Sequence, residues 1–219
     1  MGLAIFDLDN TLLGGDSDHA WGEFLIARKL VDAAVHGARN DAFYQQYTEG
    51  RLDIHDYVRF TLGPVLGYSL KELDELHEQF MAEFIAPLIL PKALALIERH
   101  KADGDHCLIM SATNSFITGP IARRLGVHDL LATDLVIQGR HYTGDIAGTP
   151  CFQEGKVIRL RQWLELQTAQ FIIKESTFYS DSFNDLPLLE AVGRPVAVDP
   201  DDRLASVATD QGWEIISLR

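Results

Sequence analysis

The chain alternates between short apolar runs and longer segments whose apolar residues recur at helical spacing. The first run, Leu3–Phe6, is unbroken, and helix-like segments such as 91–100 and 157–166 follow later runs. Short strands that alternate with helices are typical of a parallel sheet covered on both faces. The pattern therefore predicts an α/β fold with a Rossmann-like parallel sheet as its core, and Gly139-Arg140 predicts the turn of a separate hairpin. The predicted strands are 3–6, 107–110, 135–137, 177–179, 195–198 and 213–217.

Residues 16–86 differ from the rest because they carry helix signals and no convincing strand. Ser69 and Glu72 form a capping box, and apolar residues at helical spacing follow it as far as Phe84. Shorter helices are expected over 18–28, 32–47 and 53–62. An insertion after the carboxyl end of a strand lies over the crevice in which α/β sheets bind ligands. We therefore predict an α/β core domain of residues 1–15 plus 87–219 and a helical cap, or lid, of residues 16–86.

Composition and charge narrow the choice of partners. The 219 residues are 47% apolar, enough for one full core with a smaller insert, and their formal net charge is −13. A chain this acidic repels the phosphates of nucleic acids and anionic membranes, so we expect neither as a partner. The sequence has no membrane-spanning run and no basic signal-peptide start, and its two cysteines, Cys107 and Cys151, show no disulfide or zinc spacing. We expect a cytoplasmic protein with reduced thiols.

Two aspartates end the first predicted strand. Asp7 is the first polar residue after the run and would project into the crevice, and Asp9 can point to the same side. Two carboxylates this close stay ionised together only if a cation compensates them, or else one holds a proton. A hard divalent ion such as Mg²⁺ suits a site made entirely of oxygen ligands.

Polar residues also follow other predicted strands. Asp181 ends the strand 177–179 with Asp185 four residues later, Ser111 ends the strand 107–110, and Lys156 lies at the start of a helix. Each has a structural alternative, because Ser111 and Asp185 suit helix starts and Lys156 could be solvated. Backbone N–H groups and a hydroxyl at a helix start also suit a phosphate, and a lysine there indicates a specific anionic partner. Together the four clusters predict one site at the carboxyl edge of the sheet.

These residues resemble the four motifs of the haloacid dehalogenase superfamily of phosphohydrolases. "DLDNT" (7–11) is similar to the first motif, Ser111 to the second, Lys156 to the third, and "SDSFND" (180–185) to the fourth. The helical insert between the first two motifs, and "GRHYTGDIAG" (139–148), resemble the phosphoserine-phosphatase-like branch, subfamily IB. Some members of this branch are phosphoserine phosphatases and others are histidinol-phosphate phosphatases. The resemblance covers almost the whole chain.

The resemblance implies a mechanism for two residues. Asp7 would attack phosphorus and form an aspartyl-phosphate, which splits the hydrolysis into two easier steps. Asp9 would protonate the leaving alkoxide and later take a proton from the attacking water.

The resemblance also implies ligands for the metal and the phosphate. Mg²⁺ would be held by Asp7, the Asp9 backbone carbonyl and Asp181, with Asp185 close by, and it would reduce the repulsion between carboxylate and phosphate. The phosphoryl oxygens would be held by Ser111, Ala112, Lys156 and Asn184.

Departures from the branch bear on the substrate, a small phosphorylated metabolite. Asp16 falls where phosphoserine phosphatases of the branch carry an acid for the substrate ammonium. Aligned through "EGRLD" (49–53), their arginine for the substrate carboxylate becomes Thr61, with Arg59 two residues away. Loss of a charged contact disfavours a carboxylate-bearing substrate. The expected substrate is therefore histidinol phosphate, an intermediate of histidine biosynthesis; phosphoserine, or another small amino-bearing phosphate ester, is the alternative.

Candidate contacts for an imidazole ring are Asp18, His19 and Trp21. The structural alternatives are that Asp18 caps a helix and that Trp21 packs in the core of the lid.

Other classes share part of this pattern. A non-enzymatic receiver domain also has an aspartate, a hydroxyl and a lysine on a parallel sheet, but it is about half this length and lacks a helical lid. A calcium-binding EF-hand loop fails because Leu12 replaces the invariant glycine. A phosphomutase or phosphotransferase could share every core residue, and neither this choice nor the oligomeric state is encoded in a recognisable pattern.

Overall fold

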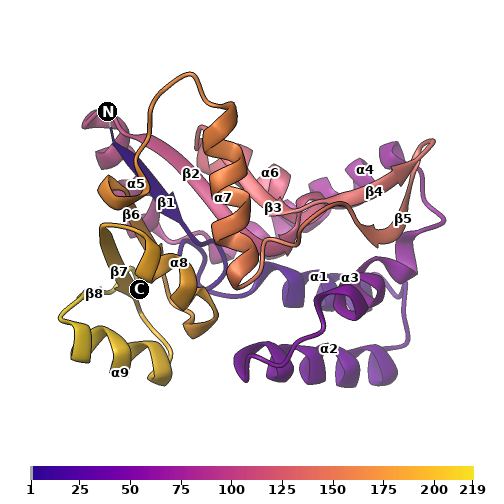
Figure 1. Cartoon of the computed structure of the whole chain (residues 1–219). Helices are drawn as coiled ribbons and strands as arrows, with labels where there is room; N and C mark the ends of the chain where they lie inside the picture. The colour runs from indigo at the N-terminus through magenta and orange to yellow at the C-terminus, as the bar shows by residue number, and fades with distance from the viewer. Residues whose placement is uncertain (1) are drawn as a thin grey trace.

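The computed structural model describes residues 2–219, so the predicted core starts one residue outside it, at Met1. A six-stranded parallel sheet, ordered β3-β2-β1-β6-β7-β8, forms the centre (Figure 1). The predicted α/β fold with a parallel sheet is confirmed. The strands are β1 (Leu3–Phe6), β2 (His106–Asn114), β3 (Asp129–Thr133), β6 (Thr177–Ser180), β7 (Arg194–Val198) and β8 (Glu214–Ile216).

Two strands differ from the sequence prediction. Strand β3 was not predicted, because its short run begins with Asp129 and lacks a strong apolar pattern. Strand β2 continues past Met110 to Asn114, with a register irregularity between these two residues. Its polar end was expected outside the strand, but those side chains have partners in the site described below.

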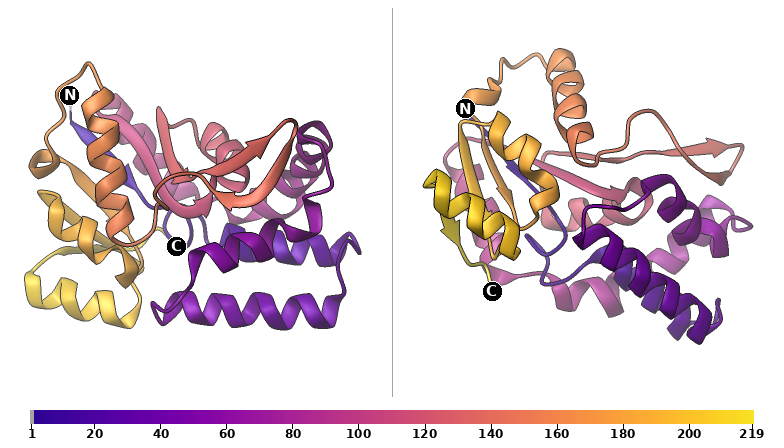
Figure 2. Two further views of the ribbon diagram at one scale, coloured as in Figure 1. Left: turned by 45° about the vertical axis from the view of Figure 1, so that its right-hand side comes forward. Right: turned by 60° about the horizontal axis from the view of Figure 1, so that its bottom comes forward.

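Helices cover both faces of the sheet (Figure 2). Successive residues of β1 point to opposite sides, so Ala4 and Phe6 join one core cluster and Leu3 and Ile5 the other. The first cluster includes α5 (Pro91–Ala102) and α6 (Ser115–Leu125). The second includes α7 (Glu154–Leu166), α8 (Leu186–Ala191) and α9 (Asp202–Gln211).

The predicted hairpin is confirmed as β4 (Leu135–Gln138) paired antiparallel with β5 (His141–Ile146). Gly139 adopts a φ of 64° in its turn, which glycine accepts without strain. The hairpin extends towards the helices of the insert (Figure 1), where Arg59 lies 3.2 Å from Asp145.

Four α-helices form the insert, as expected. Three begin at aspartates whose side chains cap the helix, and the fourth begins at the predicted capping box of Ser69 and Glu72. The helices are α1 (Ser17–Ala27), α2 (Ala33–Thr48), α3 (Ile54–Leu62) and α4 (Leu70–Phe80), and a π-helical turn, Met81–Ile85, follows the last. No helix among residues 2–219 has the length and apolar character needed to cross a membrane.

The insert leaves and rejoins the sheet at neighbouring points. Leu13 forms an isolated bridge with Ile89, and the Gly14 N–H donates to the Leu88 carbonyl at 2.7 Å. The apolar residues of the insert share one core cluster with α5 and α6. These contacts support the division into a core and a cap of residues 16–86, which remains a prediction.

Candidate active site

The site begins where β1 ends. The Asp7 N–H donates to the Tyr179 carbonyl at 2.8 Å, so Asp7 still belongs to the sheet ladder. The chain then turns, with Asn10 at a φ of 56° and the Leu12 N–H donating to the Leu8 carbonyl. The ladder therefore orients the Asp7 side chain, and the turn brings Asp9 to the same edge.

A buried ion-pair network joins the first, third and fourth motifs. Lys156 Nζ donates to Asp7 Oδ1 at 2.7 Å and to Asp185 Oδ2 at 2.7 Å, and Lys156 is only 1% exposed. Ser180 Oγ also donates to Asp185, at 2.7 Å. Burial raises the pKa of Asp7 to about 7, and the Lys156 charge opposes that rise. The charges of Asp185 and Asp7 outweigh burial for Lys156 and raise its pKa, so Lys156 stays protonated.

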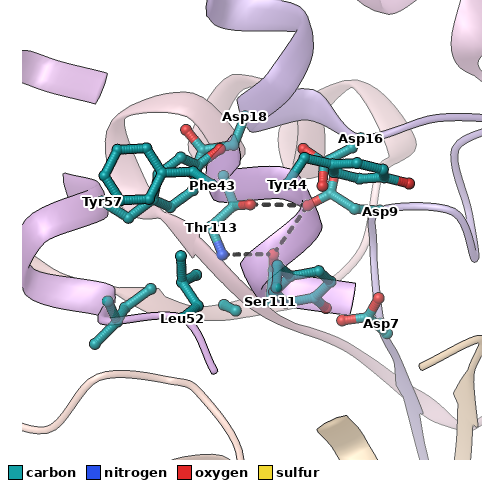
Figure 3. A pocket seen from close by; sticks show the side chains of 13 residues that line it. Asp7, Asp9, Asp16, Asp18, Phe43, Tyr44, Leu52, Tyr57, Ser111 and Thr113 are labelled. Atoms are coloured by element: carbon teal, nitrogen blue, oxygen red, sulfur yellow. Dashed lines mark hydrogen bonds between the residues drawn. The ribbon is translucent and has the colours of Figure 1, made fainter. Parts of the chain in front are cut away.

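Asp9 is held by donors from both the insert and the core. Its Oδ1 accepts from the Ser17 N–H at 2.6 Å, and its Oδ2 accepts from Thr113 Oγ1 at 2.9 Å and Ser111 Oγ at 3.5 Å (Figure 3). Burial raises the pKa of Asp9 to about 7, with a smaller contribution from the charge of Asp16. Thr113 had no predicted role. Residues two apart in a strand point to the same side, so its spacing from Ser111 could have indicated that it faces the site.

Asp181 is bound to the first motif. Thr11 Oγ1 donates to Asp181 Oδ1 at 2.9 Å and accepts from the Asp181 N–H at 3.0 Å. Burial, followed by the charge of Asp7, raises the pKa of Asp181 well above its usual value. The mutual bonds keep the ends of β1 and β6 together.

The donor set at this edge fits a magnesium ion. Three buried carboxylic acids, Asp7, Asp9 and Asp185, and the half-buried Asp181 lie near a single ammonium, Lys156. No three His, Cys, Asp or Glu side chains within residues 2–219 converge on one point as a metal site would require. The predicted ligands include only two side-chain carboxylates, with a backbone carbonyl as the third. Mg²⁺ is commonly held by one or two carboxylates and retains several waters, so the set remains compatible with it.

A cavity lies between this edge and the insert (Figure 3). It encloses about 20 Å³, room for roughly one water, so an organic phosphate can enter only if the insert moves away from the core. Its wall contains four aspartates, four aromatic residues and no lysine, arginine or histidine. The lining residues are Asp7, Asp9, Asp16, Asp18, Phe43, Tyr44, Tyr47, Leu52, Ile54, Tyr57, Ser111, Ala112 and Thr113.

The aromatic residues of the wall had no predicted role. Tyr44 and Tyr47 lie one helical turn apart near the end of α2, and Tyr57 lies on α3. Tyrosines at helical spacing look like ordinary packing residues in a sequence, and nothing local distinguishes those that face a site.

Two predicted imidazole contacts lie elsewhere. His19 Nε2 is 3.1 Å from Asp41 Oδ1 and is not part of the cavity wall. Trp21 is fully buried among aromatic rings, with Phe24, Phe80 and Phe116 at centroid distances of 5.2 Å each. Trp21 therefore has no free surface for a substrate, and the structural alternative, packing in the core of the lid, describes it.

The other predicted residues divide into two groups. Asp16, Asp18, Ser111 and Ala112 line the cavity, and it is Asp16, not Asp18, that caps α1. Asn184 was expected to hold a phosphoryl oxygen, but its Nδ2 donates to the Tyr47 carbonyl at 2.8 Å and it is absent from the wall. Its amide instead joins the fourth motif to the end of α2.

Arg59, the basic residue nearest to the expected carboxylate contact, is also outside the wall. It pairs with Asp145 at 3.2 Å on the surface. Thr61 is buried and does not line the cavity.

Comparisons with known proteins identify the family of the chain. The sequence profile of the haloacid dehalogenase-like hydrolases matches residues 4–190. A histidinol-phosphatase from Neisseria meningitidis serogroup C (strain 8013) is 47% identical, with 99% of each chain covered. Phosphoserine phosphatase SerB1 from Mycobacterium tuberculosis (strain ATCC 25618 / H37Rv) is 34% identical over 99% of this chain and 70% of that protein.

Solved structures show the same fold. A protein of unknown function from Bordetella pertussis Tohama I is 45% identical, with a TM-score of 0.90 over 99% of this chain and 98% of the other. A substrate-bound phosphoserine phosphatase complex has a TM-score of 0.72 at 16% identity, over 100% and 93% of the two chains, and shows the fold alone.

The chain belongs to the haloacid dehalogenase-like hydrolase family, because the family profile covers most of its length. The predicted enzyme class is thereby confirmed: it is a phosphatase of this family.

Proposed function

We propose that this enzyme hydrolyses a phosphomonoester through an aspartyl-phosphate on Asp7. Lys156 donates to Oδ1 of Asp7, which leaves Oδ2 free to attack phosphorus. The buried ammonium favours the ionised form of the nucleophile. The Lys156 ammonium would also attract the phosphoryl oxygens. Ser111 and Ala112 line the cavity and would contact the same oxygens.

Asp9 is suited to handle the protons. Its pKa near 7 allows the carboxyl group to hold a proton at neutral pH and to give it to the departing alkoxide. The resulting carboxylate would then take a proton from the water that attacks phosphorus. That attack breaks the bond between phosphorus and the Asp7 oxygen and yields inorganic phosphate. Ser17 and Thr113 fix the carboxyl group of Asp9 throughout.

The residues that would hold Mg²⁺ are Asp7, the Asp9 backbone carbonyl and Asp181, with Asp185 behind them. The ion would supply positive charge between the attacking carboxylate and the phosphate, which otherwise repel each other. Asp185 already shares Lys156 with Asp7, so it helps to fix the nucleophile rather than bind the substrate.

The substrate we propose is histidinol phosphate, which would place the enzyme in histidine biosynthesis. The observation that carries this proposal is the chemistry of the cavity wall, which has four aspartates, four aromatic rings and no basic side chain. An amine and an imidazole are complementary to such a wall, whereas a free carboxylate would meet like charge. The 47% identical histidinol-phosphatase from Neisseria meningitidis supports the same substrate.

Phosphoserine is the alternative, supported by the 34% identical SerB1. Its ammonium could bind at Asp16, but its carboxylate would need a cation, and Arg59 pairs with Asp145 away from the cavity. A cytoplasmic location also remains part of the proposal, supported by two buried free thiols, Cys107 and Cys151.

The test is phosphate release from histidinol phosphate and phosphoserine, with Mg²⁺ and with a chelator. We expect kcat/KM at least tenfold higher for histidinol phosphate, no turnover without the metal, and none for Asp7→Asn at unchanged circular dichroism. Asp74→Asn, an exposed acid on α4, is the matched control and should retain wild-type turnover. A tenfold preference for phosphoserine would reverse the substrate assignment, and wild-type turnover by Asp7→Asn would exclude the covalent route.

A further inference from the structure

Asp18 is a buried acid with one unpaired carboxyl oxygen. It is 4% exposed and lines the cavity, and its Oδ1 has no hydrogen-bond partner among residues 2–219. Burial, followed by the charges of Asp16 and Asp9, raises the pKa of Asp18 well above its usual value. A buried acceptor left unpaired is destabilising, because it has lost its hydrogen bonds to water. Such a group is rare in native proteins and calls for an explanation such as a missing ligand.

Asp18 and the nucleophile Asp7 lie in different parts of the cavity wall. In Figure 3 Asp18 lies at the top and Asp7 at the lower right, with Asp9, Ser111 and Thr113 drawn between them. Asp18 makes no hydrogen bond to Asp7, Asp9 or Lys156, so we assign it no part in the chemistry. Its free oxygen is available to the part of a substrate that is most distant from phosphorus.

Aromatic rings accompany Asp18 at this end. Tyr57 from α3 lies beside it in Figure 3, and Phe43 from α2 packs against Tyr57 with a centroid distance of 5.2 Å. Ring faces beside a carboxylate favour a flat group that carries an N–H donor, because stacking and a charge-assisted hydrogen bond act together. An aliphatic chain would use only the packing.

We propose that Asp18, Phe43 and Tyr57 form a distal subsite that binds a planar nitrogen heterocycle of the substrate. The inference rests on the proposed function and deepens it, because it selects among the three candidate contacts. Asp18 makes the contact, while His19 and Trp21 lie outside the cavity wall.

The order of the polar groups along the cavity supports this assignment. Figure 3 shows Asp7 on one side of Asp9, Asp16 beside Asp9, and Asp18 on the other side next to Tyr57. One oxygen of Asp16 accepts from the His19 N–H at 2.8 Å, so its second oxygen can receive an amine. Phosphate, amine and ring follow in the same order along histidinol phosphate.

Binding of the dephosphorylated product tests the subsite without catalysis. Calorimetry would compare histidinol with ethanolamine, which has the amine and the alcohol but no ring, on wild type, Asp18→Asn and Asp18→Ala. We expect both variants to bind histidinol at least tenfold more weakly and ethanolamine within about twofold of wild type, since only histidinol reaches the charged acceptor. Asp74→Asn should match the wild type on both ligands.

Thermal unfolding separates this role from a structural one. Asp18→Asn removes a buried acid and keeps an oxygen acceptor for Thr61, so its melting temperature should equal or exceed that of wild type. A lower melting temperature with proportional loss of both ligands would assign Asp18 to folding instead and overturn the subsite. Equal affinity of wild type for histidinol and ethanolamine would overturn it as well.

Kinetics then distinguishes the subsite from the proposed function. Asp18→Ala should lower kcat/KM for histidinol phosphate at least tenfold and leave that for phosphoethanolamine within about twofold. If wild type selects histidinol over ethanolamine through Asp18 but releases no phosphate from any ester with Mg²⁺, the proposed function fails and the subsite stands. If histidinol phosphate is hydrolysed equally well by Asp18→Ala, the subsite fails and the function stands.

Discussion

The ion pair of Lys156 with Asp7 and Asp185 can be tested through stability alone. Both contacts measure 2.7 Å, and all three residues are nearly inaccessible to solvent. Lys156→Met removes the ammonium and leaves two buried carboxylates to repel each other. Breaking a buried pair from one side costs about 3 to 5 kcal/mol. We therefore expect Lys156→Met to be one of the more destabilising single substitutions in this chain.

Asp185→Asn should destabilise the folded state less than Lys156→Met does. Asp185→Asn keeps one oxygen acceptor, which Lys156 and Ser180 can share as they share Oδ2 of Asp185, and it leaves Lys156 and Asp7 as a balanced pair, so we expect a loss of about 1 kcal/mol. In Lys156→Met/Asp185→Asn only Asp7 of the three network residues can still be charged, and it can relieve the charge by holding a proton. The double variant should thus lose at least 1 kcal/mol less than the sum of the single variants.

Urea unfolding at pH 7 with a chelator present, followed by tryptophan fluorescence, measures these differences. With a slope of about 3 kcal/mol/M, a loss of 3 to 5 kcal/mol lowers the midpoint by about 1 to 2 M. Lys71→Met, an exposed lysine on α4, is the control and should unfold with the wild type. If Lys156→Met unfolds within about 1 kcal/mol of wild type, or if the single losses simply add, the described charge balance is wrong.

Three further outcomes follow from contacts in and around the site. Thr113→Val removes the bond to Asp9 and should lower kcat about tenfold with KM little changed in steady-state assays, since a hydrogen bond to a charged group contributes about 1.5 to 3 kcal/mol; an unchanged kcat would refute this role. Asn184→Ala removes the bond to the Tyr47 carbonyl and should lower kcat/KM about fivefold with secondary structure retained, while an unchanged kcat/KM would show that this contact between the core and α2 does not matter for turnover. Burial lowers the pKa of His77 to about 4 from 6.5, so the unfolded chain binds more protons between these values, and stability is lost as the pH falls through that window. Urea unfolding of wild type relative to His77→Phe should lose about 3 kcal/mol from pH 6.5 to 4, and parallel pH profiles would contradict the assignment.

Local pattern was sufficient for most of the elements. Apolar runs bounded by polar residues located five of the six sheet strands, and Ser69 with Glu72 marked the start of α4. These signals act within a few residues of the chain, as caps and strand patterns do. Strand β3 was not predicted because its apolar run is short. Its place beside β2 depends on a long-range pairing.

The motif residues were predictable for a related reason. Parallel strands present their carboxyl ends at one edge, so polar residues that follow them must meet there once the sheet forms. Lys156 lies far from Asp7 in the chain, yet the topology and the charge of that edge bring the two within 2.7 Å.

The sequence by itself determined the α/β class, the acids at the strand ends and the family they indicate, because these depend on pattern and topology. Only the tertiary structure decided which residues of the insert face the cavity. Asp18 and Trp21 lie one turn apart on α1, but one lines the cavity and the other packs among Phe24 and Phe80. The physical reason is that the direction of a side chain depends on the packing of α1 against other helices, and residues far apart in the chain make that packing.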